Sequence, residues 1–480
     1  MAPDRAGPLY LALDQGGHAS RALVFDRRGA VVARGLCELS VAYPRDAWVE
    51  QDPEAMVGSI RRAIAQTLET LGERRAAIAT AGLATQRSSV VCWDRATGAA
   101  LSPVISWQDR RAHAWLERFA DRTEEIHRRT GLMLSAHYGA SKLHWCLDHL
   151  PEVQQARESG CLAFGPLASF LLFRMLRERP LWVDPANAGR TLLWNLASRD
   201  WDPVLLEMFG IPLAALPHCV PTRHAFGTLE IDGQAIPLTI SNGDQPAALF
   251  AFGAPHADSA YINLGTGAFV QRALGPNPDY YPRLLTGIVR HDSVETSYVL
   301  EGTVNGAGAA LDWIGLELGI TDLEAQLPAW LARESDPPLF LNGVSGLGAP
   351  FWVADFESRF VGEAEEWQKV VAVAESIVFL LQANLDEMRA LSPPTAQLFL
   401  TGGLSRYDGL CQRLADLNGL PAYRPAEYEA TARGTAYLLA DCPDDWSEPE
   451  PGRHFTPHAN AALRARYQRW RAVMSEATAF

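Results

Sequence analysis

Short apolar runs broken by glycine-containing turns dominate the first part of the chain. Residues 9–14 and 21–26 are two such runs, and the turn Gln15-Gly16-Gly17-His18 lies between them. Apolar runs of this length, bounded by glycine, predict β-strands joined by a tight connection. After Asp52-Pro53, a typical helix start, apolar positions recur with helical spacing over residues 56–71. The opening therefore predicts strands followed by an amphipathic helix.

A similar pattern returns in the second half of the chain. Residues 260–264 and 268–272 are apolar runs on either side of Gly265-Thr266-Gly267. Residues 398–400 then lead into Thr401-Gly402-Gly403, much as residues 77–85 lead into Gln86-Arg87. These matches predict a duplication at the scale of whole domains rather than a short repeat.

Small residues and a proline at 251–255 indicate a hinge. A chain of 480 residues is also too long for one compact core. We therefore expect an N-terminal domain of residues 1–252, a C-terminal domain of residues 253–445 and a tail of residues 446–480. An acidic, proline-rich stretch at 442–453 predicts an exposed linker, and helical periodicity at 460–474 predicts a terminal helix that docks on a domain surface.

Composition excludes several classes of protein. The formal charge of −14 provides no basic field for nucleic acid or for an anionic membrane surface. No run of about 18 apolar residues predicts a transmembrane helix, and the N-terminus lacks the apolar stretch of a signal peptide. The seven cysteines are scattered without CxxC spacing, which is typical of reduced thiols. We expect a cytoplasmic protein that binds neither nucleic acid nor membrane.

Three glycine-rich turns follow predicted strands, at Gly16-Gly17, Gly265-Thr266-Gly267 and Gly402-Gly403. Glycine allows backbone N–H groups to approach an anion closely, so turns of this kind favour phosphate binding. The chain contains no GxxxxGK[ST] loop and no GxGxxG after its first strand. The pattern therefore favours a nucleotide site that is neither a P-loop nor a dinucleotide fold.

Two aspartates occupy positions suited to phosphate chemistry. Asp14 ends the first strand, where a carboxylate beside a phosphate loop can hold Mg²⁺, and Arg21 can add positive charge there. Asp244 follows a predicted strand at 237–240 and a predicted turn at 241–243, and opens a helix. As a bare pattern this is typical of a helix N-cap, but a rigidly held carboxylate also suits a general base.

Many ordered motifs are similar to those of the FGGY carbohydrate kinases, and among them to the glycerol kinases, from about Leu9 to Leu439. The matching stretches in the first half are Leu13-Asp14-Gln15-Gly16, Ser20-Arg21, Trp48-Val49-Glu50, Thr85-Gln86-Arg87, Trp107-Gln108-Asp109-Arg110-Arg111, Ala140-Ser141-Lys142-Leu143, Asn187-Ala188 and Arg190-Thr191. Those in the second half are Gly243-Asp244-Gln245, Ala247-Ala248-Leu249-Phe250, Gly265-Thr266-Gly267, Leu300-Glu301-Gly302, Ser345-Gly346-Leu347-Gly348-Ala349-Pro350 and Gly402-Gly403.

The resemblance implies a two-domain, actin-like ATPase fold of the ribonuclease H-like type, with the active site in the cleft between the α/β domains. It implies ATP and Mg²⁺, a small polyol or sugar as substrate, phosphoryl transfer to a primary hydroxyl, and a homodimer. Asp244 is implied as catalytic base, and Asp14 and Asp244 as metal-side residues. The implied acceptor-binding residues are Arg87, Ser88, His137, Asp244 and Gln245. The implied nucleotide-binding positions are Gly16, Gly17, His18, Arg21, Gly265, Thr266, Gly308, Asp312, Gly403 and Tyr407.

The chain departs from the glycerol-kinase pattern at several of these positions. Ser88 replaces a glutamate and His137 a tyrosine of the glycerol pocket, so the resemblance leaves glycerol in doubt and favours a longer polyol or a ketose. Other positions also differ from the glycerol-kinase pattern. Gly17 and His18 replace two threonines, Asp312 replaces a glutamine, Tyr407 replaces an asparagine, and Glu363-Ala364-Glu365-Glu366 replaces Leu-Thr-Arg-Gly. A pentulose kinase of the ribulokinase or xylulokinase type remains an alternative. So does a binding or regulatory protein with weak transfer activity.

Overall fold

The computed structural model describes residues 7–231, 233–292, 295–333, 336–391, 393–426, 429–446 and 452–478. The expected absence of a signal peptide concerns residues 1–5, and part of the expected linker is residues 447–451, so both lie outside the described residues. Within the described part of the chain, no helix is both long enough and apolar enough to cross a membrane.

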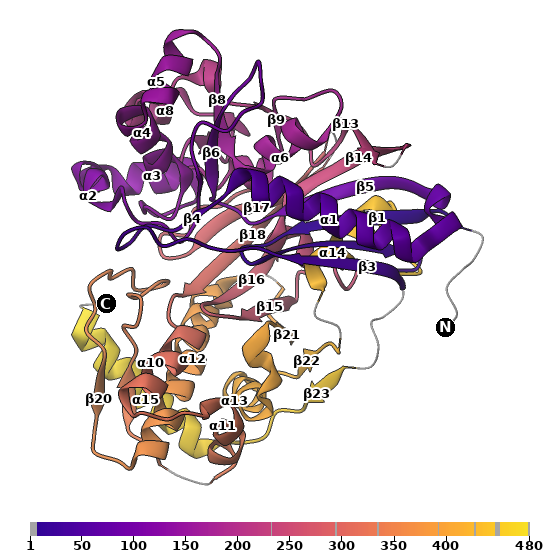
Figure 1. Ribbon diagram of the computed structural model, residues 1–480. Helices are drawn as coiled ribbons and strands as arrows, with labels where there is room; N and C mark the ends of the chain where they lie inside the picture. The colour runs from indigo at the N-terminus through magenta and orange to yellow at the C-terminus, as the bar shows by residue number, and fades with distance from the viewer. Residues whose placement is uncertain are drawn as a thin grey trace.

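The first sheet is mixed and belongs to the N-terminal half (Figure 1). Its strands lie in the order β3-β2-β1-β5-β14-β13. The bounds are β1 (Leu9–Gln15), β2 (Ala19–Phe25), β3 (Val31–Glu38), β5 (Ile78–Thr85), β13 (Arg223–Ile231) and β14 (Gln234–Gly243). β1, β2 and β3 are antiparallel, whereas β5 and β14 continue the sheet parallel to β1. The predicted strands and their tight connections are confirmed.

The second sheet repeats this topology. Its strands lie in the order β17-β18-β16-β15-β21-β22-β23, with β15 and β16 antiparallel and β21 and β22 parallel to β15. The bounds are β15 (Ser259–Leu264), β16 (Ala268–Leu274), β17 (Leu285–His291), β18 (Thr296–Val304), β21 (Gln397–Thr401), β22 (Ala422–Arg424) and β23 (Arg453–Phe455). The run β18-β16-β15-β21-β22 has the same connectivity as β3-β2-β1-β5-β14, which confirms the predicted duplication.

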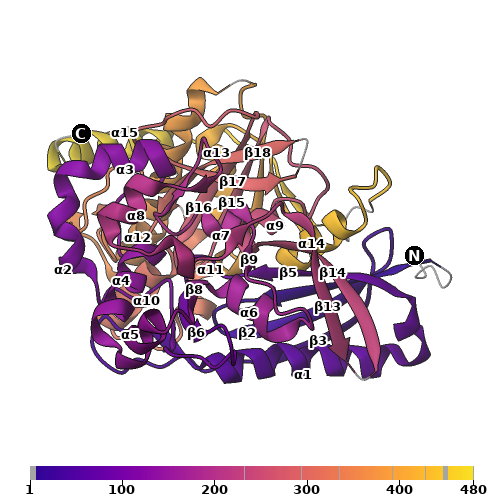
Figure 2. The same ribbon diagram turned by 90° about the horizontal axis from the view of Figure 1, so that it is seen from above.

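Long amphipathic helices cover both sheets (Figures 1 and 2). Asp52 caps the N-terminus of α1 (Pro53–Leu71) by accepting from the amides of Glu54 and Ala55, as the sequence predicts. The C-terminal sheet packs against α12 (Glu366–Glu387) and α13 (Asp408–Asn418). α10 (Gly308–Glu317) packs on α12, and the terminal helix α15 (Ala461–Thr478) packs on α13. Leu463, Tyr467, Trp470 and Met474 of α15 enter this core, which confirms the docked terminal helix.

Most of the remaining elements form an insertion in the N-terminal half with its own apolar core. A second small sheet there has the order β4-β7-β6-β8. The bounds of these and the other short elements are β4 (Glu50–Gln51), β6 (Val90–Asp94), β7 (Val104–Ile105), β8 (Leu162–Pro166), β9 (Trp182–Val183), β10 (Trp194–Asn195), β11 (Asp200–Trp201), β12 (His218–Cys219), β19 (Leu339–Leu341), β20 (Arg359–Val361), α2 (His113–Leu116), α3 (Thr123–Thr130), α4 (Gly139–His149), α5 (Pro151–Glu158), α6 (Leu167–Met175), α7 (Pro185–Ala188), α8 (Pro203–Phe209), α9 (Asp244–Ala248), α11 (Leu323–Leu331) and α14 (Ala430–Leu439).

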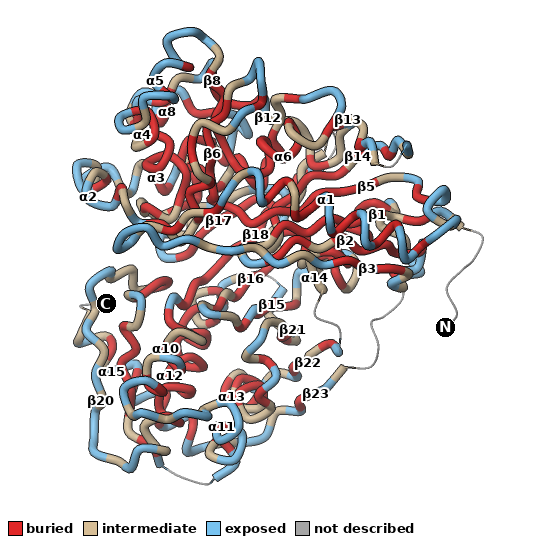
Figure 3. Tube along the Cα trace, viewed as in Figure 1, coloured by how far each residue is buried: buried red, intermediate tan, exposed pale blue. Residues whose placement is uncertain are grey.

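Elements that lie beyond residue 252 reach the N-terminal half, namely α14, β17 and β18. α14 packs on α9 and on β1, β2 and β5 of the N-terminal sheet, although it belongs to the second half by sequence. β17 and β18 extend toward the N-terminal half, where the backbone of Thr286 donates to Gly131 and the side chain of Asn242 donates to Val289. Figure 3 shows both sheets and the segments between them as largely buried. The division at residue 252 stays a prediction, and the structure adds that α14 crosses it.

One local prediction is wrong. The sequence predicts a turn at 241–243, but β14 continues to Gly243 and α9 begins at the next residue. Residues Ser241, Asn242 and Gly243 pair with Leu83, Ala84 and Thr85 of β5. Because a neighbouring parallel strand is present, the backbone of this polar segment is more stable in the ladder than in a turn.

The close packing of α14 on α9 makes Gly434 a sensitive position. A Cβ atom there would overlap with the backbone carbonyl oxygen of Ala247, which cannot rotate away. We expect Gly434→Ala to lower the free energy of unfolding by about 2 to 3 kcal/mol. Gly58 in α1 is the matched control, because its added methyl group would meet only the flexible side chain of Arg62. Gly58→Ala should be neutral or stabilising by up to about 1 kcal/mol. Urea unfolding checks both values, and equal stabilities would contradict the prediction.

Candidate active site

Three polar side chains lie at the carboxyl ends of neighbouring parallel strands. Asp14 lies near the end of β1, Arg87 follows the end of β5, and Asp244 follows the end of β14 directly. The register places Asp14 and Asn242 on either side of Ala84, so the three strand ends reach the same edge of the sheet. Carboxyl ends of parallel strands are where open α/β sheets bind ligands.

Asp14 is a buried carboxylate with little compensating charge. Its side chain is 9% exposed and its Oδ2 lies 3.6 Å from Nη1 of Arg21. Burial is the largest cause that raises the pKa of Asp14, which reaches about 7; Arg21 opposes the shift, and the negative charges of Asp244 and Glu429 add to it. The structure thus holds an acidic group that needs an additional cation to be stable in its ionised form.

Asp244 lies at the first residue of α9, where its Oδ1 accepts from the amide of Gln245 at 2.7 Å. Nε of Arg87 lies 3.8 Å from the same oxygen. Burial raises the pKa of Asp244, while Arg87 and the amide of Gln245 partly oppose the shift. The hydroxyl of Thr431, from α14, donates to the backbone carbonyl of Asp244 and ties α9 to the crossing helix.

The expected acceptor residues gather around Arg87. Its guanidinium is buried and donates to Oε1 of Gln245, and its side chain lies against Gly243, where a Cβ atom would collide with it. Ser88 is 3% exposed, has a φ of 66°, and its hydroxyl lacks a hydrogen-bond partner among the described residues. A buried orphan hydroxyl beside a buried arginine is typical of a site that binds a polar ligand.

His137 lies on the same side of the site. Its ring packs 5.4 Å from the ring of Trp107 and 4.9 Å from that of Tyr138. Burial, together with the positive charges of Arg110 and Lys142, holds the pKa of His137 well below its usual value, so the imidazole is neutral at pH 7. Nζ of Lys142 donates to the backbone carbonyls of both Ser88 (3.1 Å) and His137 (2.7 Å). One buried ammonium therefore fixes the two segments that carry the altered acceptor residues.

The first glycine loop connects β1 and β2 and faces the same edge of the sheet. The amide of Gly16 donates to Ala19, and the carbonyl of Gly17 accepts from the side chain of Gln51 at 2.6 Å. His18 is exposed. The Oε1 atom of the buried Gln86 is unpartnered among the described residues. The loop is held by main-chain and amide contacts, with its outer surface open.

The second glycine loop and Gly308 are brought together. The amide of Gly308 donates to the carbonyl of Gly265 at 3.0 Å, and the amides of Ala307 and Ala309 donate to Thr266. A Cβ atom at position 308 would lie 2.9 Å from the same carbonyl, so the close approach requires glycine. The backbone amides at the start of α10 thus donate to carbonyl groups of the second glycine loop.

The remaining nucleotide-side positions differ in exposure. Gly402, at a φ of 88°, packs against Leu264, while Gly403 next to it is exposed and has open space around it. Asp312 is exposed on α10. Tyr407 is 6% exposed in the C-terminal core, where its hydroxyl accepts from Arg406. The structure brings Gly403 close to the second loop through Gly402, whereas it buries the ring of Tyr407.

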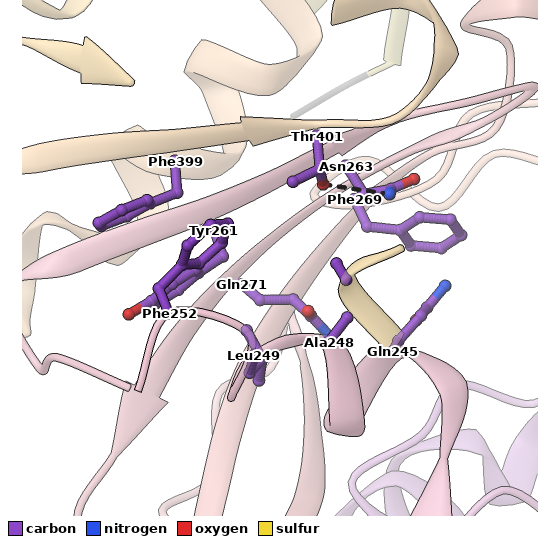
Figure 4. A pocket seen from close by; sticks show the side chains of 11 residues that line it. Gln245, Ala248, Leu249, Phe252, Tyr261, Asn263, Phe269, Gln271, Phe399 and Thr401 are labelled. Carbon is purple, nitrogen blue, oxygen red and sulfur yellow. Dashed lines mark hydrogen bonds between the residues drawn. The ribbon is translucent and has the colours of Figure 1, made fainter. Parts of the chain in front are cut away.

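A pocket lies at the seam between the halves, next to Gln245 (Figure 4). Gln245 and Ala248 of α9 line it together with Leu249, which follows this helix, and Asn263, Phe269, Gln271 and Thr401 line it from the C-terminal sheet. Tyr261 and Phe399 stack with ring centroids 5.1 Å apart on its other side. The strand ends of the first sheet therefore face the second sheet across this seam.

Sequence reasoning assigned no role to several residues at the site. Glu429 lies 3.3 Å from Nε of Arg21 and adds negative charge near Asp14. Glu301 contacts Arg87 and Arg190, and Lys142 holds Ser88 and His137. Glu301, Arg190 and Lys142 lie within motifs that match the family. A charged residue within such a motif could have indicated from the sequence that these three residues belong to the site. Glu429 has no such signal, because α14 reaches the N-terminal sheet only in the folded chain.

The duplicated α/β fold is of the actin-like type, and acidic side chains lie at the strand ends of its first sheet. Two sequence profiles of the FGGY family of carbohydrate kinases match the chain, the N-terminal domain at residues 9–251 and the C-terminal domain at residues 260–440. The chain belongs to the FGGY family of carbohydrate kinases. It is therefore an enzyme that transfers a phosphoryl group to an alcohol.

Relatives named glycerol kinase are similar over most of their length. The protein from Alkalilimnicola ehrlichii is 38% identical over 90% of this chain and 89% of its own, and that from Aromatoleum aromaticum is 34% identical over 97% and 98%. Among solved structures, Plasmodium falciparum glycerol kinase with ADP has a TM-score of 0.87 at 22% identity and covers 99% of both chains. Xylulose kinase from Rhodospirillum rubrum has a TM-score of 0.85 at 20% identity and covers 98% of both. These structures confirm the two-domain fold.

Proposed function

We propose that the protein transfers the γ-phosphoryl group of ATP to a primary hydroxyl of a small polyol or ketose, with Asp244 as the base. The observation that carries the proposal is the position of Asp244, which follows β14 directly beside both Asp14 and Arg87. A carboxylate beside an acceptor-binding arginine can take the hydroxyl proton as the oxygen attacks phosphorus. The glycerol-kinase names of the relatives support this class of acceptor.

The residues at the strand ends fit a magnesium ion. Asp14 is buried, and the negative charge of Asp244 disfavours its ionised form further, an effect that a divalent cation relieves. The described residues contain no cluster of three or more metal-ligating side chains, so the nucleotide and water would complete the coordination. When bound, Mg²⁺ would neutralise charge on the phosphates. Arg21 and the loops at Gly16-Gly17, Gly265-Thr266 and Gly403, with Gly308 behind them, would hold the phosphates, and Asp312 and Tyr407 mark the nucleoside side.

The acceptor pocket supports a substrate other than glycerol. Ser88 supplies an unpartnered hydroxyl, and His137 supplies a neutral ring that can donate or accept. Serine occupies less space than the glutamate of the glycerol kinases, so the pocket has room for a longer carbon chain. A site whose buried polar groups match particular hydroxyls rejects acceptors that leave those groups unpaired.

An ADP-release screen tests the proposal. Glycerol, tetritols, pentitols, ketopentoses and ketohexoses are each offered with ATP and Mg²⁺, and we expect at least one to raise ADP output well above the background hydrolysis. A ketopentose as the best acceptor would identify a pentulose kinase. No response to any member would contradict the proposed function and favour the binding-protein alternative.

Truncating Ser88 tests the acceptor pocket. Because the Ser88 hydroxyl has no protein partner among the described residues, Ser88→Ala removes no internal hydrogen bond and should leave the melting temperature unchanged. We expect kcat/KM for the best acceptor to fall about tenfold, the value of one lost hydrogen bond, with the KM for ATP unchanged. Ser169 is a matched control, since it is equally buried and its hydroxyl is also unpartnered within the described chain. An equal effect of Ser169→Ala would remove Ser88 from the pocket.

We also infer a cytoplasmic location and a homodimer. The seven cysteines are free in the structure, which supports a reducing compartment. Light scattering of the purified protein measures the assembly, and a monomer at micromolar concentration would contradict the dimer.

A further inference from the structure

Glu301 is a buried carboxylate of the C-terminal sheet that faces the acceptor side of the site. It lies in β18 and is fully buried. Gln271, its partner in register on β16, donates Nε2 to Oε2 of Glu301 at 2.8 Å. Gln271 also lines the pocket at the seam, opposite Gln245 of α9 (Figure 4). The C-terminal sheet therefore holds the side chain of Glu301 through Gln271, independently of any contact with the N-terminal half.

Two arginines of the N-terminal half reach the same carboxylate. Nη2 of Arg190 donates to Oε1 at 2.7 Å, and Nη2 of Arg87 lies 3.5 Å from Oε2. Burial alone would raise the pKa of Glu301, but Arg190 and Arg87 hold it below its usual value. Burial and the nearby charge of Arg190 lower the pKa of Arg87 to about 10. Arg190 thus disfavours the charged form of Arg87, whereas Glu301 favours the charged form of both arginines.

These contacts connect β18 to the acceptor pocket by two routes. Arg87 carries the first route, since it also contacts Asp244 and Gln245. Arg190 carries the second, because its positive charge lowers the pKa of Tyr138 against the effect of burial, and the ring of Tyr138 packs against His137. Gln245 and Asp244 contact Arg87 from the N-terminal half. Among the ion pairs of the described residues, only that with Glu301 reaches Arg87 from the C-terminal half.

We propose that Glu301 is a positioning residue that fixes Arg87 and Arg190, so that the acceptor pocket takes its binding geometry only when the C-terminal sheet is docked against the N-terminal half. The inference rests on the proposed function to the extent that Arg87 binds the acceptor. It adds that acceptor affinity depends on the docking of the C-terminal sheet, through the contacts of Glu301 with the two arginines.

Glu301→Gln tests this proposal with the full-length enzyme. The amide keeps the size of the side chain but removes the charge, so the two arginines repel each other and Arg87 loses its fixed position. We expect the KM for the best acceptor to rise at least tenfold, with the KM for ATP changed by less than twofold. Glu301→Asp keeps the charge one methylene shorter and should give an intermediate KM. It also serves as the test variant if the glutamine variant does not fold.

Glu375 provides a matched control. It is as buried as Glu301 and pairs with two arginines, Arg413 and Arg466, but it lies in α12 within the C-terminal core. Glu375→Gln should lower the melting temperature and leave the KM for the acceptor unchanged. If it raises the acceptor KM as much as Glu301→Gln does, the effect is one of general stability and the proposal is wrong.

A double-mutant cycle separates positioning from other roles. In an Arg87→Lys background, Glu301→Gln should have a much smaller effect on the acceptor KM than in the wild type, because the geometry of the arginine fork is already lost. Equal effects in both backgrounds, or equal rises in the KM of acceptor and ATP, would overturn the inference. Failure of the wild type to phosphorylate any acceptor would instead contradict the proposed function, so the two failures are distinguishable.

Discussion

Replacing Asp244 by asparagine is expected to lower kcat by about a thousandfold, because the variant cannot accept the proton of the attacking hydroxyl. Asparagine has nearly the same shape, and its side-chain oxygen can still accept from the amide of Gln245. The helix start and the contact with Thr431 should therefore persist. Single-turnover assays measure the rate of transfer, and calorimetry should show ATP binding close to that of the wild type.

The pH dependence gives this prediction a second measurement. A base works only when ionised, and burial raises the pKa of Asp244. The kcat of the wild type should therefore rise with pH through the pKa of this carboxyl group, and the asparagine variant should lack this rising limb. Asp244→Glu keeps a carboxylate displaced by one methylene and should retain more activity than the asparagine variant. A kcat for Asp244→Asn within tenfold of the wild type would exclude Asp244 as the base.

Asp14→Asn is expected to make the nucleotide-free protein more stable while abolishing activity. The pKa of Asp14 is about 7 in the folded chain, above the usual value of 3.8, so the folded state holds a proton that the unfolded state releases. Wild-type stability is therefore lost as pH rises from about 4 to about 7. Asparagine mimics the neutral acid and avoids this loss, which reaches about 4 kcal/mol above pH 7 by the usual conversion of pKa into free energy.

Urea unfolding at several pH values, without nucleotide or metal, measures the difference between the two proteins. The advantage of Asp14→Asn should grow by about 1.4 kcal/mol per pH unit between pH 4 and pH 7 and then level off. Asp355→Asn, at an exposed position, should show no such trend. With Mg²⁺ and ATP, the wild type should gain more stability than Asp14→Asn. If the difference in free energy of unfolding between Asp14→Asn and the wild type is the same at pH 5 and pH 8, the pKa of Asp14 is not raised in the folded protein.

Much of the fold follows from local patterns in the chain. The strands around Gly16-Gly17 and Gly265-Thr266-Gly267 are predicted by apolar runs and glycine turns, and Asp52 marks the start of α1. The turn predicted at 241–243 is wrong because local preference for a turn was weaker than pairing with β5. The local pattern had no information about that neighbouring strand.

The candidate site divides in the same way. Asp14 and Asp244 are recognisable from sequence because each follows an apolar strand and stands next to a glycine-containing turn or a helix start. The roles of Glu429, Glu301 and Lys142 at the site cannot be recognised from sequence, because the residues that they contact are distant along the chain. The contact of Glu301 with Arg87, for example, joins β18 of the second sheet to the segment that follows β5 of the first.

The sequence by itself determined the family, the strands on either side of the first two glycine turns and the two candidate aspartates, since all of these depend on neighbouring residues along the chain. Only the tertiary structure decided which charges surround those aspartates, that α14 crosses to the first sheet, and that one carboxylate of β18 holds two arginines of the other half. The physical reason is that pKa, ion pairing and burial depend on distances in space, and these are set when the two sheets pack together.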